Sequence, residues 1–234
     1  MTSPQIFYKV TLSWVPFFAI GASVFLLVGM IWGLFFAPPD YQQGDAFRII
    51  YLHVPIAFLS LLIYSAMGIF ALLLLVWRLK MAGLMLGVLA QIGATMTALA
   101  LITGSLWGKP MWGAWWVWDA RLTSELILLL LYLALLVIKN AFPNKEQGEQ
   151  IMAILSLIGL IDLPIIHYSV YWWNSLHQGA TLSLFAKPKI ANVMLYPLIC
   201  TMLGFIFYCI WLALHKAQQE VLRRDYQQNW VKKL

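Results

Sequence analysis

Five tryptophans lie within twelve residues in the middle of the chain, and an acid and an arginine follow them. The segment 107–123 reads WGKPMWGAWWVWDARLT, and we call it the tryptophan segment. Its tryptophans are Trp107, Trp112, Trp115, Trp116 and Trp118, and the charged residues after them are Asp119 and Arg121. Indole is the largest apolar side chain and offers a broad π-face with one N–H donor. Clustered in one loop, these side chains suit a large, flat, mostly apolar ligand.

An aromatic belt at a membrane interface is the alternative, because tryptophan and tyrosine gather at that depth in most membrane proteins. A belt needs only one or two aromatic residues at each helix end. Five in one short segment, next to fixed charges, favour a ligand platform.

The four histidines differ in their expected depth. A proline two residues after His53 is well tolerated in the first turn of a helix, so His53 is expected at the mouth of a membrane span. His177 lies in the loop sequence NSLHQG. Two neutral imidazoles that approach from opposite sides, beside a tryptophan surface, would suit the iron of a flat porphyrin. For either histidine alone a hydrogen-bonded interface role is the simpler interpretation, and the role of His167 stays open.

Several charged residues could serve the same ligand. Arg48, Lys109 and Arg121 could pair with porphyrin propionates, and arginine is the better bidentate partner of a carboxylate. Ordinary snorkelling to the membrane surface is the alternative for all three. Asp119 is expected to hold the Arg121 guanidinium or to orient an indole N–H. Asp162 is an acid inside a predicted span, and such residues are functional candidates because they are costly to bury in a membrane.

The composition predicts an integral membrane protein. Hydrophobic residues make up 62% of the 234 positions and charged residues 10%, and the mean hydropathy is +0.82. Soluble domains are about half apolar and about a quarter charged. The net charge of +6 is spread over helix ends and a tail, which indicates membrane topology and not nucleic-acid binding. Cys200 and Cys209 lie in one apolar run on opposite helix faces, so no disulfide is expected.

Six apolar runs are long enough to cross a bilayer, which takes about twenty helical residues. They cover roughly 12–36, 55–77, 83–106, 122–139, 150–170 and 191–214. The fourth run is short, and the fifth contains Asp162 and Pro164. No cleaved signal peptide is indicated, so the first run is expected to stay as a helix.

We therefore predict an all-α bundle of six transmembrane helices. One haem-handling transmembrane domain is expected over residues 1–214, with the tryptophan segment as a loop, and a basic tail over 215–234. The segment after Leu214 is expected to be a basic amphipathic helix or tail on the inner side, and a solvated topology anchor is favoured over a dedicated partner site.

The distribution of lysine and arginine predicts the orientation. Ten of these residues lie on one side and five on the other if both termini are cytoplasmic. Because basic residues are enriched on the cytoplasmic side, both termini are expected there. The tryptophan segment and the segments 37–54 and 171–190 would then lie on the periplasmic side.

The residues around these sites resemble a known family. WGKPMWGAWWVWDARLTSELILL resembles the tryptophan-rich WWD motif of haem-handling proteins in cytochrome c maturation. RIIYLHVPIA around His53 and HYSVYWWNSLHQG around His177, with this length and six spans, resemble the cytochrome c maturation protein C (CcmC) family over nearly the whole chain. Longer relatives share the motif but have more spans and more histidines.

The resemblance implies that haem b is bound at the periplasmic face of a bacterial inner membrane. It implies His53 and His177 as axial ligands of the iron and the motif tryptophans as the platform. The implied partners are the haem chaperone CcmE, which receives the haem covalently, the single-span subunit CcmD, the ABC-type ATPase CcmA with its permease CcmB, and membrane lipid. A lyase-like role by positioning is implied. The chain lacks a glycine-rich phosphate loop, so it is not expected to be the ATPase.

Two other functions stay open. One is a permease subunit that conducts a solute, for which Asp162 and Gln91 are the main polar groups expected at mid-membrane depth. The other is a scaffold whose tryptophan segment docks a partner protein without haem. An absorption spectrum of the purified protein would separate these from a haem site.

Overall fold

The computed structural model describes residues 3–173, 175–177, 187–188 and 190–234. Six helices in these ranges are long and apolar enough to cross a membrane, which confirms the predicted six spans. They run over Trp14–Phe36, Asp45–Trp77, Lys80–Trp112, Ala120–Ala141, Lys145–Trp172 and Asn192–Arg224.

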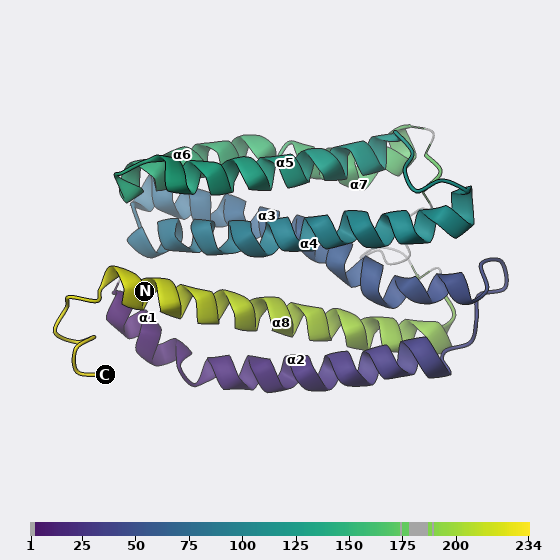
Figure 1. The fold of residues 1–234 in the computed structure, drawn as a ribbon, viewed down its shortest axis with the longest axis horizontal. Helices are drawn as coiled ribbons and strands as arrows, with labels where there is room; N and C mark the ends of the chain where they lie inside the picture. Colours follow the sequence, from purple (N-terminus) through teal and green to yellow (C-terminus); the bar gives the residue numbers. More distant parts are fainter. Residues whose placement is uncertain (1–2, 174, 178–186, 189) are drawn as a thin grey trace.

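These spans contain most of the helices labelled in Figure 1. A short α1 (Pro4–Thr11) precedes the first span, which is α2 (Trp14–Ile31) extended by a π-helical turn (Trp32–Phe36). A 3-10 turn (Asp45–Ile49) leads into α3 (Ile50–Trp77). The other helices are α4 (Lys80–Trp112), α5 (Ala120–Ala141), α6 (Lys145–Gly159), α7 (Asp162–Trp172) and α8 (Asn192–Arg224).

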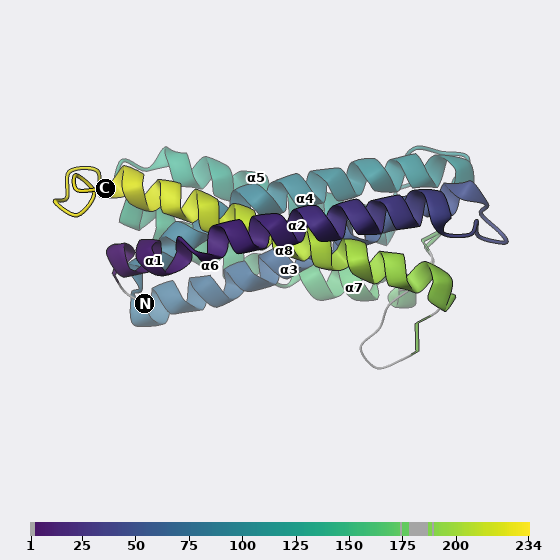
Figure 2. The same ribbon diagram turned by 90° about the horizontal axis from the view of Figure 1, so that it is seen from below.

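Helices α2 and α8 pack along each other, and the group α3–α7 lies beside this pair (Figure 1). Both termini lie at one end of the bundle, and the connection between α4 and α5 lies at the other end (Figures 1 and 2). An even number of spans requires the termini to share a side of the membrane. That this side is the cytoplasmic one stays a prediction.

The fifth span consists of two helices with a break between Gly159 and Asp162. Pro164 lies in the first turn of α7, where a missing backbone N–H costs nothing because these amides have no partner inside the helix. Asp162 begins the same helix, and an acid is favourable near the positive end of the helix dipole. The break therefore lies next to Asp162 and Pro164, the two residues that are unusual inside a membrane-spanning helix.

Helix α4 lies at the centre of the group and is approached closely by its neighbours. A Cβ on Gly87 would lie 2.9 Å from Cε of Lys139, and a Cβ on Gly93 would overlap the ring of Tyr132. Glycine at these positions therefore lets α5 pack directly against the backbone of α4, as small residues do in other membrane bundles.

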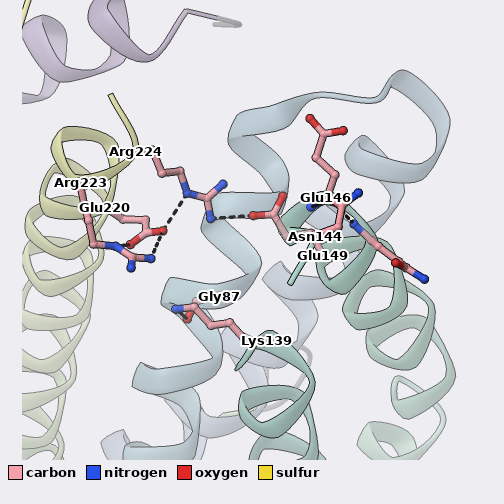
Figure 3. Close-up of polar contacts among 9 residues, drawn as sticks. Gly87, Lys139, Asn144, Glu146, Glu149, Glu220, Arg223 and Arg224 are labelled. Carbon is pink, nitrogen blue, oxygen red and sulfur yellow. Dashed lines mark hydrogen bonds and ion pairs between the residues drawn. The ribbon is translucent and has the colours of Figure 1, made fainter. Parts of the chain in front are cut away.

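The end of the bundle that holds the termini is joined by ion pairs (Figure 3). Arg224 Nη2 lies 2.6 Å from Glu149 Oε1 on α6, and Arg224 Nε lies 2.7 Å from Glu220 Oε1 on α8 itself. Lys139 Nζ donates to the carbonyl of Gly87 at 3.1 Å. We call Arg224, Glu149, Glu220, Lys139 and Gly87 the ionic cluster.

Helix α8 continues past residue 214 to Arg224, and Ala217, Gln218 and Val221 are buried. Gln218 Nε2 donates to Thr11 Oγ1 at 2.9 Å, which ties this part of α8 to α1. Residues 215–224 therefore take the helical one of the two forms expected for this segment, and one face of that helix is buried and not solvated. Cys200 and Cys209 are both free thiols, as expected.

Candidate functional site

Two histidines from distant parts of the chain meet at the end of the bundle opposite the termini. His53 lies in the second turn of α3, and His177 lies between α7 and α8. Their ring centroids are 6.3 Å apart and their planes differ by 27°. Both rings border the same two adjoining cavities, so the structure brings together the pair that the sequence singled out.

The larger of the two cavities has a volume of about 130 Å³. Besides the two histidines, the C-terminal turns of α4 form most of its wall, through Gly104, Trp107 and Trp112. The second cavity shares both histidines and is also bordered by Arg121 and Glu125.

His53 is held by one turn of α4. Its Nδ1 lies 2.9 Å from Thr103 Oγ1. The ring of Trp107 packs edge-to-face against the imidazole, with centroids 5.6 Å apart. A Cβ on Gly104 would lie 3.1 Å from His53 Cε1, so glycine there leaves room for the ring. His53 is only 7% exposed, and its orientation is set by these neighbours.

His177 is held through Asp119. The backbone N–H of His177 donates to Ser175 Oγ at 3.1 Å, and Ser175 Oγ donates to Asp119 Oδ2 at 2.6 Å. Asp119 Oδ1 also accepts from the backbone N–H of Leu122 at 2.8 Å, which caps the N-terminus of α5. One carboxylate therefore starts a helix and fixes the segment that carries a candidate ligand.

The two contacts expected for Asp119 do not occur among the described residues. Arg121 donates from Nη1 to the carbonyl of Ile166 on α7 at 3.1 Å, and no ion pair joins it to Asp119 in the part of the chain that the structure covers. No described indole N–H donates to Asp119 either. The sequence identified the residue but not its partners.

The tryptophan segment begins as helix and not as loop. Helix α4 continues through Pro110 to Trp112 and ends at Gly113, whose φ of +75° is the left-handed conformation common after a helix C-terminus. Trp107 and Trp112 therefore lie on α4, and the expectation of a loop is wrong for residues 107–112.

The five tryptophans divide into two groups. Trp107 and Trp112 border the larger cavity, and Trp107 Nε1 donates to Gln43 Oε1 at 2.9 Å. Trp112 also packs against the ring of His177, with centroids 5.7 Å apart. The other three follow in the connection to α5, where Trp115 is 56% exposed, Trp118 is 75% exposed and Trp116 packs edge-to-face on Trp118. Only the first group forms the cavity wall.

The candidate cations are placed differently from one another. Arg121 borders the second cavity. Arg48 donates from Nε to Asp45 Oδ1 at 2.8 Å and from Nη1 to the carbonyl of Gly33 at 3.1 Å, and among the residues described it borders neither cavity. Lys109 Nζ donates to the carbonyl of Gly113 and lies 5.9 Å from the ring centroid of Trp115.

Glu125 was not predicted from the sequence. It is a buried acid that borders the second cavity. Its Oε1 lies 2.8 Å from Ser60 Oγ on α3. The sequence feature that could have indicated Glu125 is its position four residues after Arg121, because this spacing places both residues on one face of a helix inside a span. Asp162 is also buried, whereas His167 is exposed and packs against Tyr168.

The fold and the site together define a multi-span helical membrane protein with two imidazoles facing one aromatic cavity. Over residues 1–232 the chain matches the family described as heme exporter protein C. It is 49% identical over 231 residues to heme exporter protein C of Haemophilus influenzae, covering 99% of this chain and 94% of that protein. It is 47% identical to heme exporter protein C of Escherichia coli K12, covering 99% and 93%.

A more distant relative comes from a plant. A protein of Marchantia polymorpha named putative cytochrome c biosynthesis ccmC-like mitochondrial protein is 44% identical over 191 residues, covering 78% of this chain and 81% of its own. The chain belongs to the heme exporter protein C family, which confirms the resemblance seen in its motifs.

Proposed function

We propose that this protein binds haem b between His53 and His177 and presents it to a periplasmic haem chaperone during cytochrome c maturation. The observation that carries the proposal is the spacing of the two imidazoles across one cavity. A neutral imidazole is a common ligand for haem iron, and both of these imidazoles border the same cavity. The observed separation of the ring centroids is 6.3 Å.

The other residues around the cavity suit the rest of the porphyrin. Trp107 and Trp112 offer apolar surface to the ring. Arg121 borders the second cavity, where its guanidinium would pair with a propionate. Arg48 would have to exchange its contact with Asp45 to do the same. The haem supplies the reactive vinyl group, and the chain contributes binding and orientation.

We assign the site to the periplasmic face of a bacterial inner membrane and the delivery step to the chaperone CcmE, in an assembly with CcmA, CcmB and CcmD. The family supports this, because its members are named as heme exporters. The structure supports it by separating the cavity from the end that holds both termini and the basic C-terminal part of α8. Exposed Trp115 and Trp118 lie in the same connection as Asp119 and form the surface that the chaperone would meet.

An absorption spectrum of detergent-purified protein, titrated with haem, tests the ligands. We expect a Soret band typical of two imidazole ligands, with strongly reduced intensity in His53→Ala and in His177→Ala. His167→Ala and His215→Ala are matched controls, because His167 is exposed and His215 packs on Trp211 far along α8, and both should keep the wild-type spectrum. Wild-type spectra in both cavity variants would refute the ligand assignment.

A second measurement tests delivery. Purified haem-loaded protein mixed with the chaperone should transfer haem to it covalently, and the two cavity variants should transfer none. A preparation that binds the chaperone without any bound haem would instead favour the scaffold function.

A further inference from the structure

Thr103 is the polar neighbour of His53 inside the bundle. It lies one helical turn before Trp107 on α4 and is buried. Its Oγ1 lies 2.9 Å from His53 Nδ1 and 2.7 Å from the backbone carbonyl of Leu99. Oγ1 also lies 3.2 Å from the backbone carbonyl of Ala100, so three electronegative atoms surround one hydroxyl group, which carries a single proton.

The single proton of the Thr103 hydroxyl determines which atom donates in each contact. The carbonyl oxygen of Leu99 can only accept, so the 2.7 Å contact contains the hydroxyl proton of Thr103. The hydroxyl then has no proton left for His53, and the 2.9 Å contact must contain a proton carried by Nδ1. This is the only assignment that places a proton in both contacts.

We propose that Thr103 is a positioning residue that holds His53 as the Nδ1–H tautomer, so that Nε2 presents its lone pair to the cavity. The tautomer is a property of this chain alone. The identity of the metal that Nε2 meets rests on the proposed function. A hydrogen-bond acceptor on the other ring nitrogen fixes both the tautomer and the ring orientation of a metal-binding histidine, and it raises the basicity of the ligand.

The hydrogen bond to Leu99 strengthens the effect. A hydroxyl that donates to a carbonyl becomes a better acceptor, because consecutive hydrogen bonds polarise one another. Nδ1 of His53 therefore donates to an activated oxygen, and Nε2 becomes more electron-rich. Such a ligand favours ferric over ferrous iron.

Helix α4 contains a matched control for this role. Thr97 Oγ1 donates to the carbonyl of Gly93 at 2.8 Å, the same intrahelical bond that Thr103 makes to Leu99. Both threonines are buried on the same helix, but only Thr103 has an imidazole on its oxygen. Thr97→Val removes the intrahelical bond alone, and Thr103→Val removes the bond to the imidazole as well.

The first experiment uses haem-free protein. Nitrogen-15 chemical shifts of histidine report which ring nitrogen carries the proton, and the His53 signals are assigned by their loss in His53→Ala. We expect the Nδ1–H tautomer in wild type, in Thr103→Ser and in Thr97→Val, and an increased Nε2–H population in Thr103→Val. A wild-type Nε2–H tautomer overturns the proposal, and this measurement needs no variant at Thr103 to fold. An unchanged tautomer in a folded Thr103→Val protein also overturns it.

The second experiment uses haem-loaded protein. Thr103→Val should weaken haem binding about tenfold, the lower end of the usual effect of removing the hydrogen-bond partner of a metal-binding histidine. It should also move the midpoint potential to more positive values, and a tenfold change in the ferrous-to-ferric ratio corresponds to about 59 mV for one electron. Thr103→Ser should restore both values, and Thr97→Val should match wild type.

The two hypotheses fail in different ways. If wild-type protein binds no haem, the proposed function fails, while the tautomer measured in haem-free protein still decides the role of Thr103. If haem binds but Thr103→Val changes neither the tautomer nor the potential, the positioning role fails and the haem site stands.

Discussion

The two ends of this bundle are stabilised by different interactions, although α4 runs through both. At the end with the termini, Arg224 links two carboxylates from α6 and α8 (Figure 3). At the other end, His53 and His177 are held by hydroxyl groups and by the edges of indole rings. Ion pairs hold the helices together at the first end, whereas the second end contains a cavity with aromatic walls.

The glycines of α4 show the same difference. Over Gly87 the space is filled by the side chain of Lys139. Gly104, on the same helix, borders both cavities and faces the edge of the His53 ring. A small residue thus allows tight packing at one end and creates open volume at the other. The site therefore depends on open space and on the orientation of its side chains, whereas the ionic cluster stabilises the bundle.

Among changes that keep both histidines, filling the cavity at Gly104 should give the largest effect on haem affinity. A Cβ already lies 3.1 Å from His53 Cε1, and the remaining atoms of leucine in Gly104→Leu would extend into the cavities. Overpacking of this kind costs about 1–3 kcal/mol of folding stability. Because the added side chain also occupies volume that the ligand needs, we expect a haem affinity roughly 5- to 150-fold lower, which corresponds to about 1–3 kcal/mol of binding free energy. Titration of purified protein with haem, followed at the Soret band, measures the loss.

Gly104→Ala should give a smaller loss than Gly104→Leu, because its single added carbon needs a shift of only a few tenths of an ångström. Gly148→Ala at the other end is the control, since a Cβ there would make ordinary contacts at 3.6 Å. Equal affinities in wild type and Gly104→Leu would show that the ligand does not occupy this space.

Removing the carboxylate of Asp119 should have an intermediate effect. Asp119→Ala removes the cap of α5, which costs about 1 kcal/mol, and it releases Ser175 from its bond of 2.6 Å. We expect a lower melting temperature and a haem affinity reduced severalfold, because the backbone next to His177 loses its anchor. Asp119→Asn keeps a side-chain oxygen for the cap and should retain more of both. A normal affinity in Asp119→Ala would show that the ligand is positioned by other contacts.

The sequence predicted the features that follow from composition and from repeated residue types. Six apolar runs gave six spans. Asp162 and Pro164 were recognised in the fifth run, but the break between its two helices was not predicted. The pairing of His53 with His177 also followed, because both were expected at one membrane surface beside the tryptophans.

Features that depend on tertiary packing were not predictable in this way. The tryptophan segment was expected to be a loop because the apolar run before it ends at residue 106, but α4 continues to Trp112. Glu125 lies in a leucine-rich run, and its partner Ser60 comes from another helix. The contact between Asp119 and Ser175 joins segments that are distant in sequence, so no local pattern could reveal it.

The smallest effect on the site is expected from the ionic cluster. Arg224→Ala leaves the largely buried Glu149 without its cation, whereas Glu220 keeps its ion pair with Arg223 at 2.7 Å. Loss of hydrogen bonds to charged groups costs about 1.5–3 kcal/mol, so the free energy of unfolding should fall by about that amount in detergent. Haem affinity should stay within twofold of wild type, because the cluster and the cavity lie at opposite ends of α4.

The exposed ion pair between Lys80 and Glu146 provides the control for that stability loss. Its side chains are 82% and 68% exposed, so Lys80→Ala should change the free energy of unfolding by less than about 1 kcal/mol. Thermal unfolding followed by tryptophan fluorescence, with a haem titration on the same samples, measures both quantities. If Arg224→Ala weakened haem binding as strongly as Gly104→Leu, the two ends would be coupled through α4 or α8. The division between a stabilising end and a binding end would then be wrong.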